Sequence, residues 1–340
     1  MKSTAYFFIT ATGIVLTLLY GKSLLVPFIF ALLLWFLVRK IRQLLDKVSF
    51  IKKHIPARLK NLFPALIILG IISFVAKILL TNINNLAQSY PIYAGNVEMI
   101  ITKINETFGI NIIENFKDQL VDFDFAKMLK NLFQSITELL SNTFLIIIFA
   151  LFIFLEEGNF GNKLKNIFID KEKYDSLDDV LGNIEKSIAN YIGIKTLVSF
   201  TTGVISYIAL LFIGIDSPLF WAFLIFILNF IPTIGSMIAT LFPAVFCLLQ
   251  FGEFTPSLLV FFIVGSIQVV IGNVLEPKIM GNTLNISPLV AITSLLVWGT
   301  IWGVTGMLLS IPITVCIVIV CSHFENTKAV AILLSEKGKI

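Results

Sequence analysis

The chain has 340 residues, of which 57% are hydrophobic and 14% are charged, and its mean hydropathy is +0.94. Soluble domains carry about 25% charged residues, so a water-soluble fold of this length could not cover its surface with so few charges. Intrinsic disorder is excluded because too much apolar side chain would need solvation. The composition therefore predicts an all-α polytopic membrane protein.

The net charge of the chain is +4, and many of its basic residues lie in one stretch. Residues 39–60 hold eight lysines and arginines and one acidic residue, Asp46, and they lie between apolar segments. Such clusters mark the cytoplasmic side of a membrane and contact anionic lipid headgroups. Nucleic-acid binding is not expected, because aromatic interleaving and a folded basic face are both missing.

Hydropathy divides the first half of the chain into apolar and polar segments. Apolar segments are predicted to be spans where they are long enough, since a spanning helix needs about 20 mainly apolar residues. Residues 81–140 hold four lysines against seven acidic residues, and their apolar positions recur at helical spacing, which predicts a small helical extracytoplasmic insertion. The predicted order is an uncleaved transmembrane hairpin (1–38), a basic cytoplasmic loop (39–61), a third span (62–80), the insertion (81–140) and a fourth span (141–156).

The second half begins with a cytoplasmic region, 157–195, whose pattern predicts an amphipathic helix over about 175–195. A transmembrane core, 196–327, follows and contains five charged residues, and 328–340 is a cytoplasmic tail. Two long apolar segments, 218–250 and 286–322, are interrupted by proline and glycine. Each is either a re-entrant hairpin or a pair of short spans, which gives about eight spans with both termini inside.

Two constellations in this core are candidates for transport or gating. Broken backbone at membrane depth is tolerated where it is buried in protein or lines a water-filled cavity, although a simple turn between short spans is the alternative. Ionisable groups beside spans are candidates for function. Glu276 and Lys278 form either a gating or proton-coupling group or an ordinary interfacial pair, and Pro277 is expected to end the seventh span at the preceding residue. The candidate residues are Asn229, Pro232, Gly235, Asn273, Glu276, Pro277, Lys278 and Gly281.

A third constellation predicts close helix packing. Gly299 and Gly303 have the GxxxG spacing that lets helices approach, and Gly306 extends the run of small residues. Trp298 and Trp302 are interpreted as interface anchors or as the lining of a solute path.

Enzymatic chemistry is not predicted. The sequence contains no GxxxxGK[ST], HExxH or GxSxG motif, and its acidic residues within the spans are isolated. Its three cysteines and two histidines lack metal-ligand spacing, so neither a metal nor a cofactor is expected.

The order and spacing of these motifs resemble the autoinducer-2 exporter family, the PerM-like permeases. The resemblance extends over nearly the whole chain, and its most specific parts are residues 229–235, 273–281, 287–289 and 298–307. It implies a bacterial inner-membrane transporter with about eight spans and both termini cytoplasmic, assembled as a homo-oligomer such as a pentamer. The residues named above match the family pattern without acquiring a binding role from that match.

Three functions remain open. The first is a secondary transporter that exports a small polar solute, such as autoinducer-2, by using an ion gradient. The second is a sodium or lithium/proton antiporter with Glu276 and Asp216 as carriers. The third is a membrane scaffold or assembly factor that acts through the 81–140 insertion.

Overall fold

The computed structural model describes residues 2–45, 143–168, 170–281 and 285–338, together with scattered positions between Gly70 and Glu106. The predicted third span and most of the 81–140 insertion lie outside the described residues. Within the described ranges, every regular element is helical. Six helices there are long and apolar enough to cross a membrane, and three shorter apolar helices accompany them. The prediction of an all-α polytopic membrane protein is confirmed.

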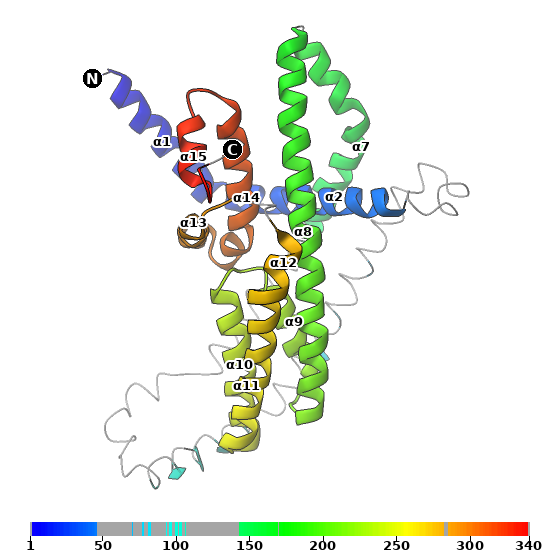
Figure 1. Cartoon of the computed structure of the whole chain (residues 1–340), viewed down its shortest axis with the longest axis vertical. Helices are drawn as coiled ribbons and strands as arrows, with labels where there is room; N and C mark the ends of the chain where they lie inside the picture. Colours follow the sequence, from blue (N-terminus) through cyan, green and yellow to red (C-terminus); the bar gives the residue numbers. More distant parts are fainter. Residues whose placement is uncertain are drawn as a thin grey trace. The chain divides into compact units, whose positions relative to one another are not determined.

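The chain divides into two compact units. The first comprises residues 1–68, 141–194 and 280–340. Helix α2 packs along α7, and α13 packs along α14 (Figure 1). A core of Ile188, Tyr191 and Ile192 from α8 meets Ile311 and Val315 from α14. The helices of this unit are α1 (Lys2–Tyr20), α2 (Lys22–Leu45), α7 (Thr143–Ile167), the first part of α8 (Lys171–Ile213), α13 (Pro288–Trp302), α14 (Val304–His323) and α15 (Lys328–Leu334).

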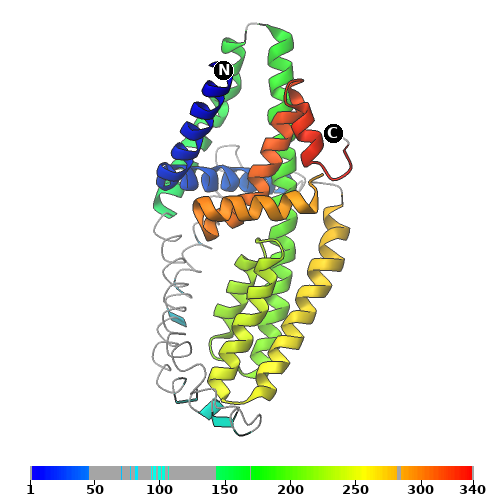
Figure 2. The ribbon, with the colours of Figure 1, turned by 90° about the vertical axis from the view of Figure 1, so that its left-hand side faces the viewer.

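The second unit comprises residues 69–140 and 195–279. Helix α11 runs back alongside α10 (Figure 2). Its aromatic core includes Trp221 and Phe246, whose ring centroids lie 4.8 Å apart. The elements are the second part of α8, α9 (Pro218–Leu228), α10 (Ile234–Phe251), α11 (Phe254–Val270), a π-helical turn, η1 (Ile271–Leu275), and α12 (Glu276–Met280).

Helix α8 differs from its sequence-based description. The predicted amphipathic helix at 175–195 and the span after it form one helix of 43 residues. The junction holds no proline, and Gly193 is tolerated inside a helix, so no local signal ends the helix there. Beyond the junction, apolar side chains at helical spacing, including Leu197, Phe200 and Ile208, are exposed, as expected of a face that contacts lipid.

The two long apolar segments are both broken, as the sequence predicts. Residues 229–233 separate α9 from α10, and Gly303 separates α13 from α14. Helix α9 begins at Pro218, a residue that suits a helix start because its missing N–H has no partner there. Helix α10 ends at Phe251 and is capped by Gly252, whose φ of 65° is readily adopted by glycine.

Described positions from the 81–140 insertion contact one end of the second unit. The Tyr93 hydroxyl donates a hydrogen bond to Asp216 at 2.8 Å, in the loop between α8 and α9. The Asn96 side chain donates to the carbonyls of Leu249 and Gln250 at 2.9 and 2.8 Å, at the end of α10. Tyr93 and Asn96 therefore contact the end of this unit that carries the α8–α9 and α10–α11 loops.

Candidate transport site

A row of buried polar side chains follows the second part of α8. Lys195, Ser199, Thr202 and Ser206 are separated by four, three and four residues, so they share one helix face. The side chains of all four are buried, although the opposite face of the same stretch is apolar and exposed. Burying polar groups costs free energy unless they find partners. The partners of these four side chains therefore indicate which chemical groups this interior can bind.

The first partner is a carboxylate. Lys195 Nζ donates to Glu276 Oε1, and the two side chains are only 7% and 17% exposed. Glu276 thus pairs across two helices and not with Lys278, whose side chain is exposed. The ion pair of Glu276 is formed with a residue 81 positions away, and not with Lys278 as in the interfacial-pair alternative.

Pro277 shapes the backbone that carries Glu276. A proline has no N–H, and its ring clashes with the carbonyl four residues earlier, here that of Asn273. The helix widens instead of ending, so the Glu276 N–H bonds to the Ile271 carbonyl in the π-helical turn η1. The expectation that the span stops before Pro277 is therefore wrong, because α12 continues to Met280. Gly281, with φ of 52°, follows its end. Such π turns are frequent at functional sites.

The second partner comes from the break after α9. Asn229 Nδ2 donates to Ser199 Oγ at 3.1 Å, and both side chains are buried. The break itself is tight, since a Cβ on Gly235 would lie 1.8 Å from the Leu228 carbonyl oxygen. Thr233 adopts φ of 58° within it. Pro232 accepts a bond from the Ile234 N–H at 2.6 Å. The break therefore places the side-chain amide of Asn229 against the polar face of α8.

Two buried polar atoms on this unit have no hydrogen-bond partner among the described residues. They are Ser206 Oγ on α8 and Gln268 Nε2 on α11. The two helices are antiparallel in chain direction, and both extend from the Lys195–Glu276 pair toward the same end of the unit (Figure 1). At about 1.5 Å per residue, Ser206 lies about 16 Å and Gln268 about 12 Å along them from that pair, so they are within one turn in depth. Each unpaired group costs about 1–3 kcal/mol in a dry interior.

Small and polar residues of α10 and α11 lie near Gln268. Gly265 lies one turn before Gln268, and a Cβ there would contact Thr240 of α10 at 3.4 Å. Thr240 is itself buried and donates to the Ser236 carbonyl. Buried polar side chains are therefore present on α10 and α11 as well as on α8.

The candidate residues from the sequence fall into two groups. Asn229 and Glu276 are brought to the polar face of α8. Asn273 and Lys278 are exposed. Asp216, the second carrier considered for antiport, lies exposed in the α8–α9 loop and accepts the Tyr93 bond. Among the described residues, no three histidine, cysteine or acidic side chains gather as metal ligands would.

Five residues of this interior were not recognised in the sequence. They are Lys195, Ser199, Thr202, Ser206 and Gln268. The signal for the first four was available: polar residues spaced by four, three and four within an apolar segment mark a buried helix face. Gln268 is the one buried polar residue of α11, and no spacing pattern can reveal it.

The glycines of the third constellation have a different arrangement from the one predicted. Gly303, with φ of 67°, is the turn between α13 and α14, so the GxxxG spacing does not lie on one continuous helix. Gly299 and Gly306 lie on either side of that turn. A Cβ on Gly306 would lie 1.8 Å from the Trp298 carbonyl oxygen, and one on Gly299 would lie 2.9 Å from Met307 Cε. Close packing is present, but it is packing within a helical hairpin.

Trp302 is buried in the same region and is not an interface anchor. Its indole Nε1 donates to the Leu18 carbonyl of α1 at 2.8 Å, and the side chain is 1% exposed. The Trp298 ring lies 5.0 Å away between centroids.

Comparison with known proteins agrees with this architecture. The model of the AI-2E family of transporters matches residues 7–326. The AI-2 transport protein TqsA of Escherichia coli is 28% identical over 325 residues, which cover 94% of this chain and 92% of TqsA. A protein of Haemophilus influenzae, provisionally named a transport protein, is 29% identical over 93% of this chain and 91% of its own length.

A shorter match has higher identity. A protein of Borreliella burgdorferi, also provisionally named a transport protein, is 39% identical over 193 residues, 56% of this chain and 53% of that protein. The match to the family model covers nearly the whole chain, including both broken hairpins and the π turn before Glu276. The chain is thus a multi-pass membrane protein that belongs to the AI-2E family of transporters.

Proposed function

We propose that the chain is a secondary transporter of the bacterial inner membrane that exports a small polar solute by using an ion gradient. The observation that carries this proposal is the buried polar face of α8, together with two buried groups that have no hydrogen-bond partner among the described residues, Ser206 Oγ on α8 and Gln268 Nε2 on α11. A solute with hydroxyl or carbonyl groups would supply the missing hydrogen bonds. TqsA is named for AI-2 transport, so AI-2 is the first solute to test.

The Lys195–Glu276 pair gives this transporter a group that can respond to an ion. Protonation of Glu276 would remove its negative charge and leave the buried Lys195 ammonium without a counter-charge. A buried, uncompensated charge is strongly destabilising, so the interior would rearrange on protonation. If the 81–140 insertion is outside, as predicted, the pair lies toward the cytoplasmic end of the second unit, opposite the loops that the insertion contacts.

The test uses the full chain in proteoliposomes with AI-2 as the solute. We expect AI-2 flux above that of protein-free vesicles, and its loss when the proton and sodium gradients are both collapsed. Glu276→Gln should reduce the flux at least about tenfold, since the ion-responsive charge is lost. Glu253→Gln, which neutralises an exposed acidic residue in the α10–α11 loop, is the matched control and should leave flux unchanged. Flux that survives collapse of both gradients would reject ion coupling.

Sodium or lithium/proton antiport is the second candidate, and the same ion pair favours it. Antiport needs a carboxylate that can bind a proton or a metal cation in turn. A carboxylate that pairs with a buried ammonium, and can bind either ion in its place, meets this need. A pH-sensitive dye inside the vesicles separates the two functions. Antiport predicts alkalinisation or acidification on a sodium or lithium pulse without any solute, whereas the exporter predicts a pH change only when AI-2 is present.

A further inference from the structure

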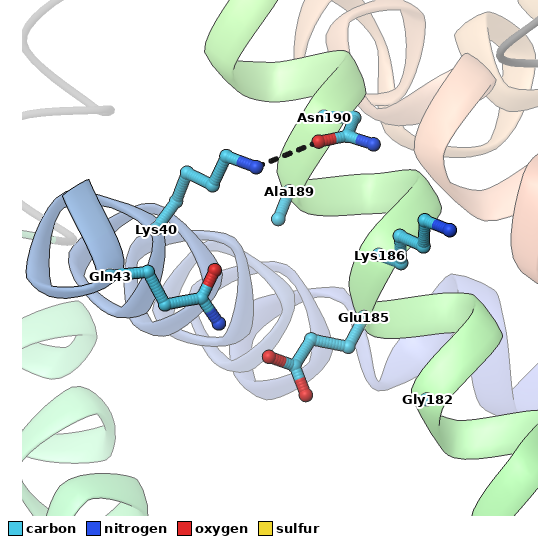
Figure 3. Close-up of a pocket in the computed structure, with 7 residues that line it drawn as sticks. All are labelled: Lys40, Gln43, Gly182, Glu185, Lys186, Ala189 and Asn190. Atoms are coloured by element: carbon cyan, nitrogen blue, oxygen red, sulfur yellow. Dashed lines mark hydrogen bonds between the residues drawn. The ribbon is translucent and has the colours of Figure 1, made fainter. Parts of the chain in front are cut away.

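A cavity of about 230 Å³ lies between α2 and α8 in the first unit (Figure 3). Lys40 Nζ donates to Asn190 Oδ1 at 2.9 Å and so joins the two helices across it. Five of its seven lining residues are polar or charged. The lining consists of Lys40 and Gln43 from α2, and Gly182, Glu185, Lys186, Ala189 and Asn190 from α8. A polar cavity of this volume can hold a compact ionic group with its hydrogen-bond partners.

The cavity has an excess of positive charge. Its one carboxylate, Glu185, is bound by Arg39 at 2.7 Å and is therefore already compensated. Lys40 is bonded to a neutral amide, and Lys186 is exposed. Among the described residues, neither lysine has a carboxylate partner within ion-pair distance.

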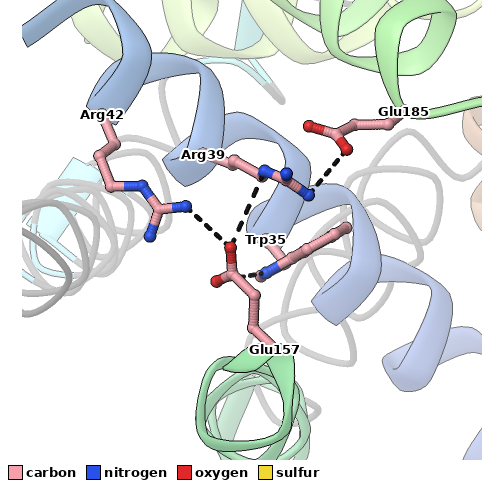
Figure 4. A network of polar contacts seen from close by, with 5 residues as sticks. All are labelled: Trp35, Arg39, Arg42, Glu157 and Glu185. Carbon is pink, nitrogen blue, oxygen red and sulfur yellow. Dashed lines mark hydrogen bonds and ion pairs between the residues drawn. The ribbon is translucent and has the colours of Figure 1, made fainter. Parts of the chain in front are cut away.

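The wall formed by α2 is held in place by a polar network (Figure 4). Glu157 of α7 accepts hydrogen bonds from Arg42 at 2.8 Å and from Trp35 Nε1 at 3.1 Å. The Arg39 guanidinium lies 5.3 Å from the Trp35 ring centroid while it holds Glu185. In this network Arg39 and Arg42 of α2 are paired with carboxylates, whereas Lys40 lines the cavity.

The cavity also lies where both helices change from apolar to polar sequence. On α2 the apolar run from Leu24 to Val38 ends directly before Arg39 and Lys40. On α8 the polar stretch ends near Asn190, and Tyr191 and Ile192 after it are buried. Such a boundary corresponds to the headgroup level of a bilayer. The predicted topology makes this the cytoplasmic leaflet, whose anionic lipids attract basic groups.

We propose that this cavity binds the phosphate of an anionic phospholipid of the cytoplasmic leaflet. Lys40 and Lys186 contact the phosphate oxygens. Asn190, whose Oδ1 is engaged by Lys40, donates through Nδ2, and Gln43 closes the polar rim. Free inorganic phosphate shares this chemistry, so the test includes it as a separate arm. The proposal does not depend on which solute the protein transports.

The experiment measures lipid binding to the purified full chain in detergent by native mass spectrometry. The probes are phosphatidylglycerol, phosphatidylcholine and inorganic phosphate. We expect phosphatidylglycerol to bind at least about tenfold more tightly than phosphatidylcholine. The double variant Lys40→Ala/Lys186→Ala should weaken phosphatidylglycerol about thirtyfold, since each lysine near an anionic surface contributes about 1 kcal/mol.

The control variant also removes two positive charges, but from lysines outside the cavity. Lys171→Ala/Lys328→Ala deletes two exposed lysines that do not line the cavity, and it should leave phosphatidylglycerol binding within about twofold. Gln43→Glu adds a carboxylate at the exposed rim and should weaken binding without any loss of packing. Equal weakening in the control, or unchanged binding in both cavity variants, would overturn the proposal. Inorganic phosphate that binds as tightly as phosphatidylglycerol would overturn the assignment to a lipid.

Discussion

Lys195 is a buried cation in an otherwise apolar stretch, so its free energy depends on one partner, Glu276. Removing one member of a buried pair leaves an uncompensated charge and costs about 3 kcal/mol, whereas replacing both members by neutral groups is often close to neutral. We therefore expect Lys195→Met to lower the melting temperature in detergent, and Lys195→Met/Glu276→Gln to recover most of the loss.

The control for that cycle is Lys278→Met. Lys278 is two residues from Glu276 but its side chain is exposed, so its loss should change the melting temperature little. A Lys278 variant as unstable as the Lys195 variant would show that the sequence neighbour, and not Lys195, is the partner of Glu276.

Asn229 and Asn273 were equal candidates in the sequence, and the structure separates them. Asn229 is buried and donates to Ser199 Oγ, while Asn273 is exposed. Asn229→Ala should cost about 1–3 kcal/mol in the free energy of unfolding, because a buried group on Ser199 loses its partner. Asn273→Ala should cost less than about 0.5 kcal/mol. Denaturant titration of both variants checks the difference, and equal effects would contradict it.

The two broken segments have a common design at the level of the helix. Each begins with Ser-Pro-Leu, at Ser217 and at Ser287, and continues as a short apolar helix and a turn. In each, a glycine just after the turn, Gly235 or Gly306, approaches the backbone carbonyl at the end of the preceding helix. Proline and glycine interruptions in paired apolar segments are features of transporter sites.

This design makes a strong steric prediction. A Cβ at Gly235 or at Gly306 would lie 1.8 Å from a carbonyl oxygen, and backbone cannot move aside as a flexible side chain can. Overpacking of this kind costs about 1–3 kcal/mol or more. We expect Gly235→Ala and Gly306→Ala each to lower the melting temperature and the yield of folded protein.

Gly193→Ala is the matched control for both variants. Gly193 lies inside α8, and a Cβ added there would have no heavy atom within 4 Å, so alanine should be neutral or should stabilise the helix. If alanine at all three positions behaves alike, the close approach of the hairpins is not present in the protein.

At the scale of the whole molecule, the predicted topology assigns the two hairpins to opposite sides of the membrane. Counting spans from the basic loop, the segment 218–250 begins and ends outside, and 286–322 begins and ends inside. Glu253 and Glu325 follow these segments and are exposed, so each can report on its side.

The measurement is thiol labelling in intact cells. Cys247, Cys316 and Cys321 are first replaced by alanine, and Glu253→Cys or Glu325→Cys is then introduced. An impermeant maleimide should label Glu253→Cys in intact cells, and Glu325→Cys only after the cells are permeabilised. The opposite pattern would invert the topology and place the basic loop outside.

The sequence by itself determined the environment and the interruptions of the chain. Lipid offers no hydrogen bonds to the backbone, so apolar segments of sufficient length must be helices, and this inference needs no tertiary contact. Pro232 and Gly235 act on their own backbone, which is why the break after α9 could be placed from the sequence, whereas the turn at Gly303 was interpreted as part of a helix-packing motif. A continuous α8 was missed because the change from polar to apolar residues marks a change of surroundings and does not end a helix.

Only the tertiary structure decided which side chains meet. Glu276 lies 81 residues from Lys195, and its sequence neighbour Lys278 was the only opposite charge that spacing could offer. Glu276 follows the π turn and pairs with Lys195 of α8, and Asn229, in the break after α9, donates to Ser199. These partners depend on how several helices pack, and packing is set by the combined shape of many side chains, so no local pattern in the chain contains it.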